Sequence, residues 1–210
     1  MKNILSIIIF LVMAVAAFAQ TPKEIIDRMS AEWDKHEAEG MGMTLDTKIP
    51  VLGTVTITDY SLGKKNRGES DVMGTHVSTW DDGVTAWAYN AKTNKLKITN
   101  STINASYEGN SDADLFTGVS NGYDLSIKEE TADSWLILCK KSKTNQDKDA
   151  PKNIEIRVAK GTFYPISLKT KMSGFPITIR DITFGISEDL VTFHPEDYPD
   201  AIIEDEREKK

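Results

Sequence analysis

The chain has 210 residues, a formal net charge of −7 and a single cysteine. This length suits one domain with its own core, and the acidic balance argues against a nucleic-acid partner, because phosphate binding needs clustered Lys and Arg. One cysteine excludes an internal disulfide, so the core alone must hold the fold together.

The first residues predict a secretory signal. A Lys near the start precedes the apolar run ILSIIIFLVMAVAAF, and the small residues Ala17 and Ala19 lie just before Gln20. The run is short and close to the start for a membrane anchor, which is the alternative interpretation. We therefore expect cleavage after Ala19, with residues 1–19 removed and residues 20–210 forming a single exported domain.

An amphipathic helix is predicted directly after the signal. Thr21 suits the N-cap, Pro22 the first helical position and Glu24 the reciprocal cap. Gly40 is a typical C-terminal stop. Apolar residues recur at helical spacing between these ends: Ile25, Ile26, Met29 and Trp33.

Beyond the helix the apolar period changes to two. The segments are short, and Gly, Asn, Asp or Pro separates most of them. They cover 44–49, 54–62, 76–80, 85–89, 95–99, 123–130, 134–142, 153–159, 165–172, 176–186 and 190–193. This many short strands predict a large antiparallel sheet, curved or closed.

Two segments depart from this rhythm. The stretch SDADLFTGVSNG (111–122) favours a short helix, which would cover one face of the sheet. In PITIRDITF, Ile177 and Ile179 share one face, whereas Ile182 and Phe184 share the other, unless a bulge near Asp181 corrects the register.

The pattern GVSNG around Ser120 matches the G-x-S-x-G motif of serine hydrolases. A nucleophile elbow needs a strand before the serine and a helix after it, but here a helical pattern precedes Ser120 and a strand pattern follows. We therefore interpret it as a turn and expect no enzyme activity. The competing interpretation is a secreted hydrolase that pairs Ser120 with His194 or His76.

The sequence contains no metal or cofactor motif. His36, His76 and His194 lack metal-ligand spacing, and there is neither a P-loop nor a dinucleotide fingerprint. Cys139 lies in an alternating strand, which favours a small buried residue over a reactive thiol. We therefore expect neither a metal nor a cofactor.

Aromatic and aliphatic residues on the predicted strands are the remaining signal. One set of alternate positions should face inward, either as an ordinary filled core or as an inner surface that is partly unfilled and able to accept acyl chains. Periodicity does not separate these two alternatives.

The order of elements resembles the LolA-like family of periplasmic lipoprotein carriers. The segment DDGVTAWAYNAKTNKLKI is similar to a family segment at Asp82, Gly83, Trp87 and Tyr89, and ITFGISEDLVTFHPEDYPDAII is similar to its closing strand and tail at 193 and 195. The resemblance covers nearly the whole chain after the signal, in order and spacing.

The resemblance implies a mainly β fold with α-helices (α+β), in which a curved antiparallel sheet forms an unclosed half-barrel. An N-terminal helix and a short lid helix would cover it. Acyl chains of lipoproteins would bind non-covalently inside, and a monomeric periplasmic carrier would take them from an inner-membrane exporter to an outer-membrane acceptor. The residues that it implies for the cavity and lid are Ile25, Met29, Trp33, Trp87, Tyr89, Leu115, Phe116, Ile177, Ile179 and Phe184.

The chain differs from the family at one basic position. Family members have an arginine after the early hairpin, where this chain has Gly63, and Arg67 matches a second basic position that could contact the lid. The difference is compatible with a divergent member that carries another lipid or only senses one. A structural module with a filled core and no ligand is a further alternative.

Overall fold

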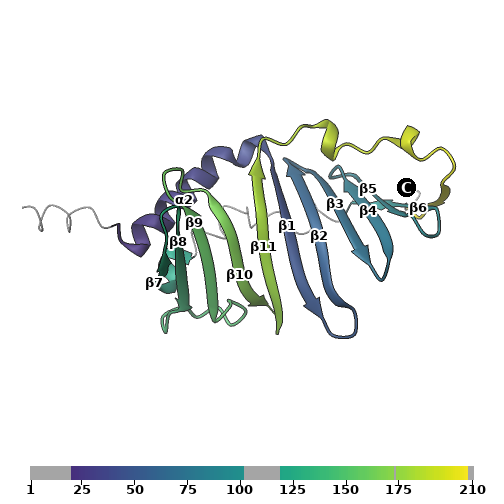
Figure 1. Cartoon of the computed structure of the whole chain (residues 1–210). Helices are drawn as coiled ribbons and strands as arrows, with labels where there is room; N and C mark the ends of the chain where they lie inside the picture. Colours follow the sequence, from purple (N-terminus) through teal and green to yellow (C-terminus); the bar gives the residue numbers. More distant parts are fainter. Residues whose placement is uncertain (1–19, 102–118, 173, 208–210) are drawn as a thin grey trace, which may run out of the picture.

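The computed structural model describes residues 20–101, 119–172 and 174–207 (Figure 1). Helix α2 (Pro22–His36) leads into the 3-10 helix η1 (Glu37–Glu39). The strands are β1 (Met41–Ile49), β2 (Gly53–Leu62), β3 (Lys65–Val72), β4 (Thr75–Asp81), β5 (Thr85–Asn90), β6 (Lys95–Asn100), β7 (Tyr123–Glu130), β8 (Ser134–Lys141), β9 (Asn153–Ala159), β10 (Pro165–Met172), β11 (Phe175–Phe184) and β12 (Ile202–Asp205). Two more 3-10 helices, η2 (Asp189–Val191) and η3 (Pro195–Asp197), precede β12. Within the described ranges, no helix is long and apolar enough to cross a bilayer.

The twelve strands of the described residues form one sheet in the order β12-β6-β5-β4-β3-β2-β1-β11-β10-β9-β8-β7. Neighbours are antiparallel, except that β12 pairs with β6 in parallel. The sheet curves without closing, with β7 and β12 at its two ends (Figure 1). The predicted unclosed half-barrel is confirmed.

The start of helix α2 follows its sequence signals. The Thr21 backbone N–H donates to Glu24 Oε2 at 2.8 Å, and the Glu24 N–H donates to Thr21 Oγ1 at 3.2 Å. This reciprocal cap satisfies two N–H groups that lack a partner within the helix. Gly40 adopts a φ of 76°, a left-handed conformation that costs glycine little, and the chain turns there into β1.

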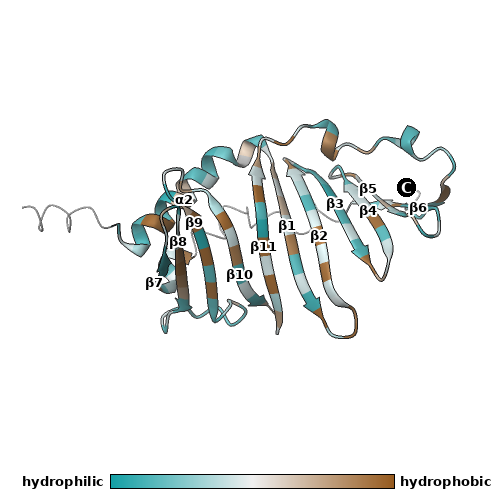
Figure 2. Ribbon diagram, viewed as in Figure 1, coloured by the Kyte–Doolittle hydropathy of each residue, from teal (hydrophilic) through white to brown (hydrophobic). Residues whose placement is uncertain are grey.

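Helix α2 packs its apolar face on one face of the sheet, which we call the helix face. Ile25, Ile26 and Met29 are fully buried there. Figure 2 shows hydrophobic positions recurring along β8 to β11 and β1. Cys139 belongs to this core, and burial raises the pKa of its thiol to about 12. The prediction of a buried structural cysteine is confirmed.

A bulge in β11 restores the apolar face of that strand. The pairing of β1 with β11 shifts register between Gly42 and Thr44, and Asp181 has a φ of 53°. The extra residue returns Ile182 and Phe184 to the core contacted by Ile179. Of the two alternatives that the sequence left open, the bulge near Asp181 is therefore the one present.

The strand predictions fail at three places. Residues 190–193 were expected to form a strand, but Asp189–Val191 is the 3-10 helix η2. Strands β3 and β12 were not predicted. Strand β3 has the polar sequence KNRGESDV, because ionic pairs and a covering segment satisfy one of its faces in place of apolar packing. Strand β12 is a four-residue edge strand, too short to show a period.

Candidate functional site

A row of apolar side chains crosses seven neighbouring strands of the helix face. Directly paired residues point to the same face. The registers join one such residue from each strand from β2 to β7: Ile57, Leu45, Ile179, Leu168, Ile156, Ile137 and Ile127. The row ends at β3, where the partner of Ile57 is Ser70.

Burial changes along this row. Ile137 and Ile156 are fully buried and Leu168 is 6% exposed, near the residues packed by helix α2. Ile179, Leu45 and Ile57 are only half-buried. The row therefore continues from a closed core onto a partly exposed apolar surface, which we call the open end of the row and define by Leu45, Ile57 and Ile179.

Six of the residues expected in the cavity lie on the helix face. Ile25, Met29 and Trp33 project from helix α2 into the core, and the Trp33 and Phe184 rings meet edge to face with centroids 5.5 Å apart. Ile177 and Ile179 lie on β11 and are half-buried. The structure thus brings helix α2 and strand β11 together on the helix face. The lid residues Leu115 and Phe116 lie outside the described residues.

Trp87 and Tyr89 lie on the opposite face. Neighbouring residues of a strand alternate between faces, so Thr44 and its partner Thr58 point away from the face of Leu45. Pairing continues from Thr58 to Glu69, Ser78 and Tyr89. The structure therefore does not place Trp87 and Tyr89 with helix α2. The missing information was the register of β2 to β5, which periodicity does not contain.

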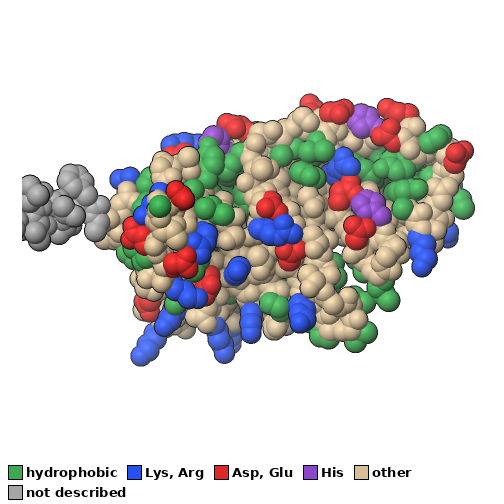
Figure 3. Space-filling view, viewed as in Figure 1, with side chains coloured by type: hydrophobic (Ala, Val, Ile, Leu, Met, Phe, Trp, Pro, Cys, Tyr) green, Lys and Arg blue, Asp and Glu red, His purple; other side chains and the backbone are tan. Residues whose placement is uncertain are grey.

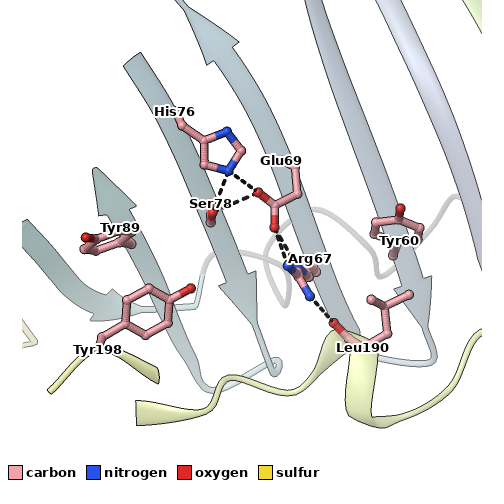
Figure 4. A pocket seen from close by; sticks show the side chains of 8 residues that line it. All are labelled: Tyr60, Arg67, Glu69, His76, Ser78, Tyr89, Leu190 and Tyr198. Atoms are coloured by element: carbon pink, nitrogen blue, oxygen red, sulfur yellow. Dashed lines mark hydrogen bonds and ion pairs between the residues drawn. The ribbon is translucent and has the colours of Figure 1, made fainter. Parts of the chain in front are cut away.

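The segment 186–201, which we call the C-terminal segment, covers that opposite face. A cavity of about 460 Å³ opens between it and strands β2 to β5 (Figure 4). Its lining residues are Tyr60, Arg67, Glu69, His76, Ser78, Tyr89, Leu190 and Tyr198.

Arg67 anchors the C-terminal segment in this cavity. Its Nε donates to Glu69 Oε1 at 2.8 Å, and Nη1 donates to the Leu190 carbonyl oxygen at 3.3 Å. Its guanidinium carbon also lies 5.4 Å from the centroid of the Trp80 ring. Arg67 thus holds the segment on the face opposite helix α2.

Glu69 joins Arg67 to a histidine. Its Oε2 accepts a hydrogen bond from Ser78 Oγ at 2.8 Å and lies 2.8 Å from His76 Nε2. His76 Nδ1 lies 3.1 Å from Asp71 Oδ1. The hydrogen bond with Asp71, together with the charge of Glu69, raises the pKa of His76.

Asp71, His76 and Ser78 have the connectivity of a hydrolytic triad but not its chemistry. Ser78 Oγ lies 3.3 Å from His76 Nε2, yet that nitrogen is closer to Glu69, and the serine hydroxyl donates to Glu69. A general base must be neutral to accept a proton, whereas two carboxylates favour the imidazolium of His76. The arrangement suits an ionic network that binds the C-terminal segment.

Ser120 lacks the strand-turn-helix context of a nucleophile elbow. Residues 119–122 are helical and β7 begins at Tyr123, so helix precedes strand, the reverse of a nucleophile elbow. Strand β7 is an edge of the sheet, far in strand order from β4, which carries His76. Among the described residues, no group of His, Cys, Asp or Glu could hold a metal ion.

Comparison with solved structures shows relatives of this fold. The lipoprotein LppX of Mycobacterium tuberculosis matches with 10% identity over 78% of this chain and 96% of its own, at a TM-score of 0.52. LprF from Mycobacterium bovis matches with 9% identity over 80% and 96%, at a TM-score of 0.53. At these identities the likeness shows the fold alone.

A LolA superfamily protein from Nitrosomonas europaea is also among the matches, with 9% identity over 83% of this chain and 99% of its own. Its TM-score is 0.31, which is too low to support an argument. No family model and no curated protein sequence matches the chain.

Proposed function

We propose that this protein binds acyl chains of lipoproteins, or of other lipids, on the helix face of its half-barrel and carries them between membranes without covalent chemistry. The observation that supports this most is the open end of the apolar row. Leu45, Ile57 and Ile179 continue a buried core and stay half-buried. Such a surface is costly in water unless something apolar covers it.

The energetics suit a carrier. An acyl chain contributes about 0.8 kcal/mol per buried CH2, so several chains need an extended apolar shelter, and a row across seven strands offers one. Release requires that the empty state be nearly as stable as the loaded one. Leu115 and Phe116 would then cover the empty surface as a lid.

The proposal places the protein in the periplasm after cleavage behind Ala19. There it would receive cargo from an inner-membrane exporter and deliver it to an outer-membrane acceptor. The LppX and LprF matches support the half-barrel fold on which this proposal is built. Arg67 is left out of the proposed surface, because Glu69 and Leu190 bind it on the opposite face.

The test is binding of the exported form, residues 20–210, to a triacylated lipoprotein and to the same lipoprotein without its acyl groups. We expect binding only to the acylated form. Leu45→Gln combined with Ile57→Gln should weaken it at least tenfold, since two half-buried apolar contacts are lost. Thr54→Gln, on the other face of β2, is the matched control and should bind as the wild type does.

Equal binding of acylated and acyl-free lipoprotein would refute the proposal, as would equal loss in the Thr54 control. Circular dichroism and thermal unfolding of each variant separate loss of binding from loss of fold. A native mass spectrum of the protein from its own host identifies the bound lipid.

A further inference from the structure

Exposed apolar side chains gather at one end of the sheet. Five of the ten large hydrophobic residues that are exposed in the described ranges lie on three hairpin tips. They are Val51 and Leu52 between β1 and β2, Met73 between β3 and β4, and Met172 and Phe175 between β10 and β11. These tips share the lower end of the molecule in Figure 1, and we call them the apolar rim.

Two of these residues are both exposed and strained. Val51 is fully exposed with a φ of 73°, and Met73 is 79% exposed with a φ of 51°. A β-branched residue at positive φ is a genuine outlier, where glycine would be more stable. Neither side chain gains burial that would offset the strain. At Met73 the two-residue turn between the paired Val72 and Thr75 requires the positive φ, so the unusual feature is an exposed apolar side chain where glycine or asparagine is common.

The β1–β2 and β10–β11 tips enclose an apolar hollow of about 540 Å³. Ile49, Pro50, Phe175 and Pro176 line it, with Lys48 beside them. The two tips therefore form one apolar surface that spans four strands.

Lysines outnumber acidic residues around this surface although the protein as a whole is acidic. Lys48 and Lys171 flank the two tips, and the neighbouring 141–153 connection contributes Lys143, Lys148 and Lys152 beside Asp147 and Asp149. None of these five is among the lysines that form ion pairs within the described part of the chain. Figure 3 shows several basic side chains and apolar atoms along the lower edge.

We propose that the apolar rim docks on a bilayer that contains anionic headgroups. The exposed tips would enter the interface, and the surrounding lysines would lie against the headgroup charges. A bilayer can accept separate projecting tips one by one, whereas a protein partner would need a matching pit for each. The proposal does not depend on acyl chains binding to the helix face, because the two surfaces share no named residue.

The test is flotation of residues 20–210 with two kinds of vesicle, phosphatidylglycerol mixed with phosphatidylethanolamine, and phosphatidylcholine alone. We expect at least tenfold tighter binding to the anionic vesicles, since each lysine near such a surface contributes about fivefold. Raised salt should weaken the binding. Failure to float with the anionic vesicles would overturn the proposal and would point to a protein partner for the rim.

Substitutions at the two tips with positive φ separate membrane binding from folding. Val51→Gly combined with Met73→Gly should unfold at the same temperature as the wild type or higher, because it relieves positive φ, yet bind anionic vesicles about tenfold more weakly. Lys48→Gln with Lys171→Gln should reduce both affinity and salt dependence.

The control is Val84→Gly, at the opposite end of the sheet, where the side chain is 75% exposed. It removes the same valine side chain from a tip that is not part of the apolar rim, and it should leave flotation unchanged. Equal loss of binding in the Val84 control, or unchanged binding in the Val51 and Met73 variant, would contradict the assignment of the rim. Acylated-lipoprotein binding, measured on the same variants, reports separately on the proposed carrier function.

Discussion

The rings of Trp87 and Phe193 stack, with centroids 4.9 Å apart and an angle of 17° between their planes. Trp87 lies on β5 and Phe193 on the C-terminal segment, so this contact joins two parts of the chain that are far apart in sequence. It belongs to a second apolar cluster, on the face opposite helix α2, in which Trp80, Leu96 and Val191 are also buried. The half-barrel is thus covered on both faces, by different ends of the chain.

Removing Phe193 should loosen the C-terminal segment. Phe193→Ala loses contacts with Trp87, Trp80 and Tyr198. We expect a loss of about 2–3 kcal/mol in the free energy of unfolding, below the full value for a buried Phe because the ring is half-buried. Urea denaturation measures it, and limited proteolysis should cut the segment sooner. Phe175→Ala, at an exposed tip, should change stability little.

Stability should depend on the protonation of His76. Its folded-state pKa is raised above the ordinary value of 6.5, mainly by the hydrogen bond with Asp71. The stabilisation is therefore fully present below pH 6.5 and is lost as pH rises through the raised pKa. The difference in unfolding free energy between wild type and His76→Gln, measured in urea over a pH series, should shrink across that window. A difference that grows with pH would contradict the ionic network described for Glu69.

Cys139 should be inert in the folded protein. Burial raises the pKa of its thiol to about 12, so almost no thiolate exists at pH 8. A thiol-reactive dye should label the native chain only on the timescale of unfolding and label it fully in denaturant. Rapid stoichiometric labelling of the native protein would show that the core around β8 opens readily. Cys139→Ala supplies the blank.

Deleting Asp181 should leave the two faces of β11 unchanged. Without the bulge residue, Ile182 follows Arg180 directly, so Ile179, Ile182 and Phe184 alternate regularly and stay in the core. We expect the deletion variant to keep a cooperative thermal transition, and loss of that transition would show that the core depends on the bulge itself. Deletion of Gln146, in the polar 141–153 connection, removes one residue without shifting a strand pair and should be tolerated as well. Substitution of Asp181 by Asn, which tolerates positive φ, should keep the fold.

Local signals in the sequence were sufficient for the elements that depend on nearby residues. The cap of Thr21 and Glu24, the helix to His36 and most strands follow from capping chemistry and from a period of two. The bulge at Asp181 was also predictable. The apolar residues of this ten-residue strand change from one set of alternate positions to the other, and one extra residue in the strand keeps both sets on the same face.

The tertiary structure decided which face each alternating set occupies and what covers it. Trp87 and Ile179 lie on strands with the same alternation. The C-terminal segment nevertheless covers Trp87, whereas Ile179 lies on the helix face. Strand β3 has no apolar period, because Arg67 and Glu69 form an ion pair on it and Arg67 also donates a hydrogen bond to the chain beyond Ile186. An apolar period of two shows that side chains alternate between the faces of a strand. Which face is buried depends on the strand register and on the distant segments that pack on it, and neither can be read from neighbouring residues.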